Sequence, residues 1–291
     1  AIRDFPNAIF LPGFWSEFGM CTEPSAFGCR PRWEQNELPF AESVVDSPEE
    51  MEALDTPDPR KQGLPPLMLG RLRRMRPRIE EEGHLLTFAV ARGPLNIASF
   101  VRGSTELLMD LKIHADEARA MLETITDFLV DWLRLQKETI STIDGILVLD
   151  DVVGFIGEED FLEWGKPYLE RCFNAFDAAV RFFHNDSEGR VCAPHLADMG
   201  VNLFNFSSDH GLNEMRELAG EDVALMGNLP PRDVLAGGSP ADVCQGVRDM
   251  LKDAPDRAVI PSCGGGMPPG VPTDNIRAFV NAVSEHSEKR E

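Results

Sequence analysis

Short apolar runs rich in Val, Ile, Leu and Phe alternate along the chain with longer stretches whose apolar residues recur at helical spacing. This alternation is typical of βα units that build a parallel sheet. The runs predict strands at Ala8–Leu11, Leu85–Val90, Gly145–Leu149, Ala179–Phe183, Leu203–Phe206, Val223–Met226 and Ala258–Ser262, with a weaker candidate near Ser43–Val45.

The stretches between these runs predict helices. The clearest is 115–141, where Leu122, Ile125 and Leu129 recur at the spacing of one helix face. The full set of expected helices is Leu64–Met75, Ser104–Asp110, Ala115–Ser141, Glu158–Ala178, Val191–Met199, Leu212–Ala219, Pro240–Leu251 and Asp274–Ser284.

Eight alternating units in 291 residues predict the α/β class and a single (β/α)8 TIM barrel rather than an open sheet. The lack of G-x-G-x-x-G after the first run favours the same choice. No compositional break divides the chain, so we expect one barrel domain over residues 1–291, with 17–62 as a long excursion. Residue 1 is Ala and a strand-like run follows almost at once. Whether an N-terminal segment is missing stays open.

Net charge narrows the choice of partners. The chain has 28 basic and 49 acidic residues and a formal charge of −21. Because nucleic acids are bound through neutralising Lys and Arg, this balance argues against nucleic acid as a partner and favours small molecules or proteins. No apolar run is long enough for a bilayer span, and the first residues lack the pattern of a secretion signal, so we expect a cytoplasmic protein with no membrane partner.

In a barrel the active site lies at the carboxyl ends of the strands, so the polar residues that follow each apolar run are the candidates. Five runs end in such residues: Asp150 and Asp151; His184, Asn185 and Asp186; Ser207 to His210; Gly227 and Asn228; and Cys263 with Gly264, Gly265 and Gly266. Adjacent residues of a strand point to opposite faces, so at most one of Asp150 and Asp151 is expected to enter the site.

His184, Asp186 and Cys263 are of the ligand types that zinc takes, namely an imidazole, a carboxylate and a thiolate. A fourth position would stay open for substrate. The spacing alone also fits, and by itself favours, a second interpretation, in which His184 is a hydrogen-bonded strand-end residue and Cys263 a buried core thiol.

The three glycines after Cys263 allow close approach of the backbone to a ligand, and they also suit a tight turn. His210 has two interpretations as well. With Asp209 it could orient a substrate, or the segment 207–209 could cap a helix.

The order of motifs resembles the uroporphyrinogen decarboxylase superfamily. The matching segments run through nearly the whole chain: Gly93 to Phe100 with Gly103, Asp150-Asp151, Phe161 to Tyr168, His184 with Gly189, Gly200, Gly220 to Val223, Gly227-Asn228, and Gly264 to Pro272. The resemblance implies a (β/α)8 barrel.

Within that superfamily the chain looks like the cobalamin-dependent methyltransferases, either the methylcobalamin:coenzyme M type or the O-demethylases. Their H-x-C pattern with a distant Cys is matched by His184 and Cys263, whereas Asp186 stands in place of the middle Cys. Glu23 lies in a segment that resembles the acidic stretch after their first strand, which makes it a further candidate ligand.

The resemblance implies a zinc-dependent methyltransferase. It would move a methyl group between a corrinoid, carried as cobalamin by a partner corrinoid protein, and a small thiol, methyl ether or similar donor or acceptor. Asp150, Asp151, His210 and Asn228 are then candidates for positioning substrate or corrinoid, and the glycine turn 264–266 for binding the cofactor.

Two alternatives remain open. One is a metal-independent decarboxylase of the uroporphyrinogen type, which needs several inward arginines; Arg92 and Arg102 are the candidates near a strand end. The other is a non-catalytic barrel that binds a tetrapyrrole.

Overall fold

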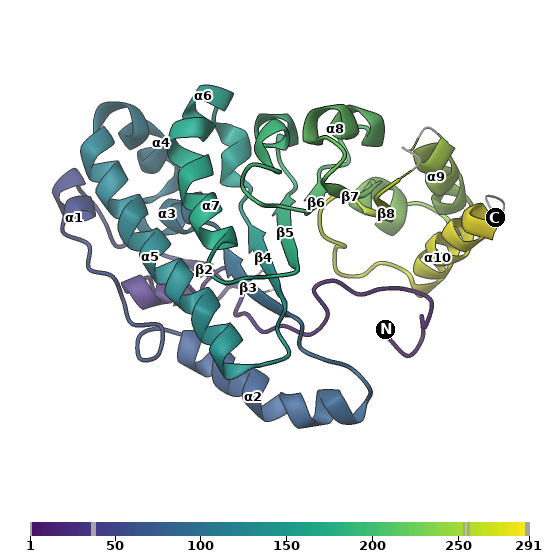
Figure 1. The fold of residues 1–291 in the computed structure, drawn as a ribbon, viewed down its shortest axis with the longest axis horizontal. Coiled ribbons are helices and arrows are strands. Elements are labelled where there is room, and N and C mark those ends of the chain that lie inside the picture. Colours follow the sequence, from purple (N-terminus) through teal and green to yellow (C-terminus); the bar gives the residue numbers. More distant parts are fainter. Residues whose placement is uncertain (1, 36–38, 253, 255–256, 289–291) are drawn as a thin grey trace. The chain divides into compact units, whose positions relative to one another are not determined.

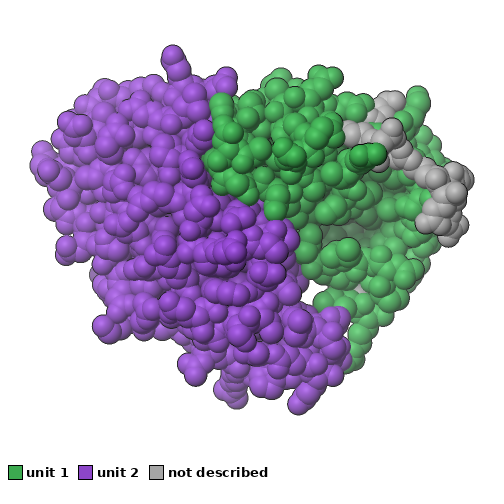
Figure 2. All heavy atoms as spheres, in the orientation of Figure 1, with its two compact units in different colours: residues 1–11, 182–291 green, residues 12–181 purple. Residues whose placement is uncertain are grey.

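The computed structural model describes residues 2–35, 39–252, 254 and 257–288. It divides into two compact units, one of residues 12–181 and one of residues 1–11 with 182–291, coloured purple and green in Figure 2. That the whole chain forms one barrel domain stays a prediction.

Parallel strands and a long helix form the centre of the unit 12–181 (Figure 1). Strands β3 (Phe88–Arg92) and β4 (Gly145–Leu149) pair in parallel, with Phe88 opposite Gly145 and Arg92 opposite Leu149. Between them the chain forms α3 (Pro94–Arg102), α4 (Ser104–Ile113) and α5 (Ala115–Thr139).

Helix α5 is tied to β3 by one side chain. Gln136 accepts the Val90 N–H at 3.0 Å and donates to the Val90 carbonyl at 3.0 Å. Both polar groups of a buried strand residue are satisfied in this way. The contact fixes the helix face that carries Trp132, one turn earlier, against the strand.

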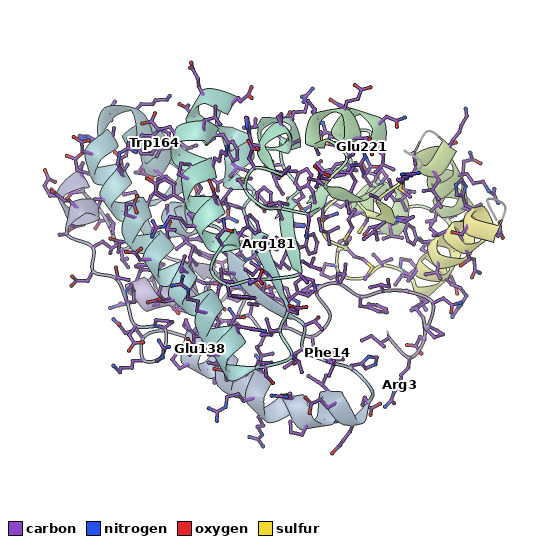
Figure 3. The ribbon with its side chains drawn as sticks, in the orientation of Figure 1. Arg3, Phe14, Glu138, Trp164, Arg181 and Glu221 are labelled. Atoms are coloured by element: carbon purple, nitrogen blue, oxygen red, sulfur yellow. The ribbon has the colours of Figure 1, made fainter. Side chains whose placement is uncertain are left out.

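The remaining elements of this unit are short apart from α2, a 17-residue helix. They are η1 (Pro24–Phe27), β1 (Pro31–Arg32) paired antiparallel with β2 (Phe40–Ala41), α1 (Pro48–Glu52), α2 (Pro65–Glu81), η2 (Val152–Phe155), α6 (Glu158–Asp160), the π-helical turn η3 (Phe161–Gly165) and α7 (Lys166–Phe173). Buried aromatic side chains, including Trp164 (labelled in Figure 3), pack between the helices.

Four strands supply the sheet of the other unit. They are β5 (Val180–Asn185, which enters the unit at Phe182), β6 (Leu203–Phe206), β7 (Ala224–Leu229) and β8 (Val259–Cys263). Each pairs in parallel with the next, so their carboxyl ends lie at one edge. The connections are η4 (Gly189–Val191), η5 (Ala193–His195), α8 (Leu212–Ala219), η6 (Pro231–Ala236) and α9 (Pro240–Lys252), and α10 (Thr273–Glu288) follows β8.

Helices α9 and α10 pack side by side over the end of β7 (Figure 1). Their core contains Leu229, Val243, Val247 and Ala282, all at most 4% exposed. Ser239 begins α9 with a capping box. The Ser239 N–H donates to the Asp242 carboxylate, and the Asp242 N–H donates to the Ser239 hydroxyl.

Most predicted elements are confirmed within a few residues, and three are wrong. Residues 8–11 and 43–45 form no strand, and 191–199 forms two 3₁₀ turns in place of a helix, since Pro194 interrupts the segment. Predicted helix 158–178 is divided by the π turn η3 and ends at Phe173. Among the described residues no helix is both long and apolar enough to cross a bilayer. The cytoplasmic location stays a prediction.

Candidate functional site

A hydrogen bond between neighbouring strands fixes the ring of His184. His184 of β5 lies opposite Asn205 of β6, and its Nδ1 is 2.8 Å from the Asn205 Oδ1. The Asn205 Nδ2 donates to the Met226 carbonyl at 2.7 Å and to the Cys263 carbonyl at 3.2 Å. Because the amide nitrogen is committed to carbonyls, Oδ1 must be the acceptor and His184 Nδ1 carries the proton. The Nε2 of His184 therefore keeps its lone pair.

Asp186 lies beside this ring. A ring nitrogen of His184 and a carboxylate oxygen of Asp186 are within 4.8 Å of each other. An imidazole held by a carbonyl-type oxygen through its second nitrogen is the arrangement in which proteins present histidine to a metal. The pair thus suits a zinc ion, for which both donor types are ordinary ligands.

The thiol of Cys263 is directed elsewhere. Its Sγ lies 3.5 Å from the Gly265 carbonyl, and burial raises the pKa of the thiol above its usual value. Within the described residues Cys263 does not come close enough to His184 and Asp186 to form a ligand group with them.

Close packing explains two of the three glycines after Cys263. The Gly264 and Gly265 N–H groups donate to the Leu229 and Phe206 carbonyls at 3.0 and 3.1 Å. A methyl group at Gly264 would overlap the backbone of Ser208, and one at Gly265, which has φ of +76°, would lie 2.8 Å from Asp186 Cβ. The turn therefore fits against the candidate metal pair, and its first two N–H groups are not free to bind a cofactor.

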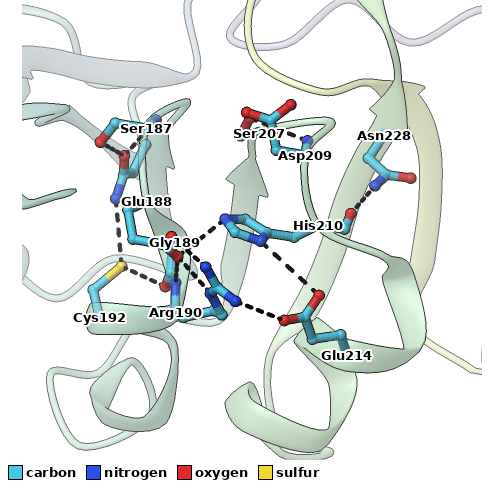
Figure 4. Close-up of polar contacts among 11 residues, drawn as sticks. Ser187, Glu188, Gly189, Arg190, Cys192, Ser207, Asp209, His210, Glu214 and Asn228 are labelled. Atoms are coloured by element: carbon cyan, nitrogen blue, oxygen red, sulfur yellow. Dashed lines mark hydrogen bonds and ion pairs between the residues drawn. The ribbon is translucent and has the colours of Figure 1, made fainter.

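His210 belongs to a charged network in the same unit, drawn in Figure 4. Its Nε2 lies 3.1 Å from Glu188, and its Nδ1 lies 3.9 Å from Glu214. The hydrogen bond from Arg190 is the main reason why the pKa of Glu188 is lowered to about 2. The Asn228 amide donates to the His210 carbonyl. The network joins the loop after β5 to the start of α8, so His210 and Asn228 have structural partners already.

Asp150 anchors a helix in the unit 12–181. Its two oxygens accept the N–H groups of Leu95 at 2.9 Å and Asn96 at 3.1 Å, at the start of α3. The side chain is fully buried, and a methyl group at Gly93 would overlap it. Burial raises its pKa to about 8, the neighbouring Asp151 adds to the rise, and the N–H donors act against it. Asp151 is half-buried and precedes η2.

Glu23 is also buried and lies beside an arginine. Its Oε1 accepts the Arg92 N–H at 3.3 Å. Burial raises the pKa of Glu23 to about 7, although the Arg92 charge lowers it. The Arg92 guanidinium pairs in turn with Glu17 at 2.9 Å. Glu23 belongs to the unit 12–181, whereas His184, Asp186 and Cys263 belong to the other unit.

Neither arginine near the β3 end is free for a substrate carboxylate. Arg102 pairs with Asp110 at 2.8 Å, with only 11% and 3% of the two side chains exposed, and Arg92 pairs with Glu17.

Sequence reasoning missed Asn205 and Glu188 as site residues. Asn205 left a signal, because an amide inside the fully buried strand Leu203–Phe206 must find hydrogen-bond partners. Glu188 left none, since an acidic residue in a loop is common.

Comparison with known proteins places the chain among relatives of two activities. It is 23% identical over 271 residues to the methylated-thiol–coenzyme M methyltransferase of Methanosarcina mazei, covering 92% of this chain and 71% of that one. It is also 23% identical over 260 residues to the uroporphyrinogen decarboxylase of Christiangramia forsetii, covering 86% and 73%.

Solved structures give the fold. A methyltransferase from Methanosarcina mazei superposes with a TM-score of 0.78 at 19% identity, over 91% of this chain and 78% of that one. The predicted α/β class with a (β/α)8 barrel is thereby confirmed. The model of the family described as uroporphyrinogen decarboxylase (URO-D) matches residues 13–286. The chain belongs to the uroporphyrinogen decarboxylase family.

Proposed function

We propose that the protein is a methyltransferase that moves a methyl group between a corrinoid and a small thiol, methyl ether or similar substrate. The observation that carries the proposal is the pair His184 and Asp186, with the imidazole held by Asn205 so that Nε2 is available to a metal. The likeness to a methylated-thiol methyltransferase over 92% of the chain supports the same reaction type.

Zinc is the metal we propose, held by His184 and Asp186, with Cys263 and Glu23 as further candidate ligands. Bound there, zinc would act as a Lewis acid that lowers the pKa of a substrate thiol or polarises an ether oxygen. The imidazole and carboxylate are ordinary zinc ligands.

The chain's own residues prepare this chemistry. Asn205 keeps the proton of His184 on Nδ1, away from the metal-binding side. Gly265 allows the turn after β8 to approach Asp186, which keeps the carboxylate near the ring. The Cys263 thiol, which faces the Gly265 carbonyl, must turn and release its proton before it can bind a metal as thiolate.

A partner protein would carry the corrinoid as bound cobalamin, and we propose that the pair meets in the cytoplasm. Asp150, Asp151, His210 and Asn228 would act as positioning residues. Asp150 holds the start of α3, and the bond from Asn228 to the His210 carbonyl ties the loop after β6 to strand β7. The glycines 264–266 would shape the turn, with Gly266, which has open space around it, as the one free to approach a ligand.

Uroporphyrinogen decarboxylation is the second candidate, because a relative of that name is equally identical to this chain. A metal-independent decarboxylase needs unpaired arginines for substrate carboxylates. Arg92 and Arg102 both pair with carboxylates of this chain, which favours methyl transfer.

The test is a direct comparison of the two reactions. The protein loaded with zinc is mixed with methylcobalamin and 2-mercaptoethanol, and loss of the methyl–cobalt bond is followed by the visible spectrum. The same preparation is given uroporphyrinogen, and release of carbon dioxide is measured. We expect demethylation of methylcobalamin that is lost in His184→Ala. Carbon dioxide release without demethylation would overturn the proposal.

A further inference from the structure

A small hollow lies at the end of β3 in the unit 12–181, whereas His184, Asp186 and Cys263 belong to the other unit. Its wall includes Trp15, Glu17, Glu23, Arg92 and Trp132. The space open to a water-sized group is about 10 Å³. That is room for about one water molecule or one ligand oxygen.

Two buried donors of this wall lack an acceptor. The indole Nε1 of Trp132 and the guanidinium Nε of Arg92 have no hydrogen-bond partner within the described part of the chain. Trp132 is 2% exposed, and the Arg92 side chain is 14% exposed. Because it is unfavourable to leave a buried donor without an acceptor, two such donors on residues that line one hollow point to an oxygen that belongs there.

The charges around the hollow select the kind of oxygen. The positive charge of Arg92 is already balanced, since its Nη2 donates to Glu17 at 2.9 Å. Glu23 adds a second carboxyl group to the same wall. An anion placed here would meet two carboxyl groups and one neutralised guanidinium, so a neutral acceptor fits better.

We propose that this hollow is a binding subsite for the oxygen of an uncharged small molecule, a carbonyl, sulfoxide or ether, which accepts from Trp132 Nε1–H and Arg92 Nε–H. The residues of the subsite all belong to one unit, and its test uses neither zinc nor a methyl donor. The oxygen fills the hollow, whose wall also includes the half-buried residues Trp15 and Glu17.

Nuclear magnetic resonance of the two donors tests this directly. Protein labelled with ¹⁵N on Trp and Arg is titrated with acetamide and dimethyl sulfoxide as neutral probes, and with acetate as the charged comparison. Trp132→Phe identifies the Trp132 indole signal by its loss. We expect the Trp132 Nε1–H and Arg92 Nε–H signals to shift saturably with the neutral probes and much less with acetate.

Arg92→Lys is the matched variant, because it keeps the positive charge and removes the Nε–H donor. We expect it to weaken the binding of dimethyl sulfoxide by about 2- to 10-fold, the effect of one hydrogen bond. If it does not fold, Trp132→Phe provides the second test through the Arg92 Nε–H signal, with the same loss expected. The absence of saturable shifts, or stronger shifts with acetate than with neutral probes, would overturn the proposal. Neither result bears on methyl transfer.

Discussion

His184 Nδ1 and Asn205 Oδ1 lie 2.8 Å apart, and the other side of the Asn205 amide is bonded to two backbone carbonyls. The orientation of the amide therefore decides the tautomer of the imidazole. Through this bond the protein keeps one ring nitrogen of His184 ready to bind a metal, so Asn205 supports the proposed zinc site without being a ligand.

Replacing Asn205 by Ala should weaken zinc binding. Mutation of the residue that hydrogen-bonds to a metal-binding histidine typically weakens metal affinity by about 10- to 100-fold, and we expect the zinc affinity to fall by a factor in that range. Competition with a chelator of known affinity measures it. Asn174→Ala is the control, since the Asn174 side chain donates to the Glu170 carbonyl at the end of α7, outside the proposed site. Equal zinc affinity in the Asn205→Ala and native proteins would contradict the role of the amide.

Gly265→Ala should disturb both stability and metal binding. Alanine at φ of +76° is strained by about 1–2 kcal/mol, and its methyl group would lie 2.8 Å from Asp186. We expect a lower melting temperature and weaker zinc binding. Gly266→Ala, at the next residue of the same turn with open space around it, should change neither. Similar behaviour of the two variants would show that the turn does not support Asp186.

The burial of Asp150 predicts a pH dependence of stability. Its pKa is raised to about 8 in the fold, against about 3.9 when unfolded, so between these values the folded state holds the extra proton. The free energy of unfolding should then fall as the pH rises from about 4 to about 8. Glu23, with a pKa raised to about 7, shifts stability in the same direction.

Urea unfolding at several pH values measures this slope. Asp150→Asn cannot titrate and should give a flatter profile than the native chain, although it loses one of the two acceptors for α3. A native profile that rises through this pH range would contradict the assignment of a buried, protonated Asp150.

Arg102 should be a structural residue and not a substrate-binding one. Removing it in Arg102→Met leaves Asp110 buried without its partner, which should destabilise the protein by about 3–5 kcal/mol. The double variant Arg102→Met/Asp110→Leu should recover much of that loss, as measured by urea unfolding. Methyl transfer per folded molecule should be unchanged. A specific loss of activity at full stability would support the decarboxylase alternative instead.

The strands were predictable where packing alone decides the structure. Residues 203–206 and 212–219 form a strand and a helix at the predicted bounds, because their apolar spacing matches one period. The helix Pro94–Arg102 was not predicted, although Pro94 stands at its first turn, where proline is favoured. The strand prediction at 8–11 was wrong, because a short apolar run does not by itself show that a segment pairs with a sheet.

The site was predictable only in part. Spacing brought out His184 and Asp186, which lie close together, and strand-end position brought out Cys263 and His210. The sequence pattern could not show that the Cys263 thiol faces the Gly265 carbonyl, because this depends on the conformation of the turn. Nor could it show that Asp150 caps α3, because that contact joins segments far apart in the chain. Charge and residue type alone did not separate a free arginine from one that is paired with Glu17 or Asp110.

Metal content tests the central claim most directly. The native chain is purified without chelators, reloaded with zinc and analysed by mass spectrometry beside His184→Ala, Asp186→Ala and Cys263→Ala, with His195→Ala of η5 as the control. We predict about one zinc per chain in the native and control proteins, and loss of zinc in the His184, Asp186 and Cys263 variants with melting temperatures retained. A native chain that stays free of metal, or a folded His184→Ala variant that keeps its zinc, would contradict the account.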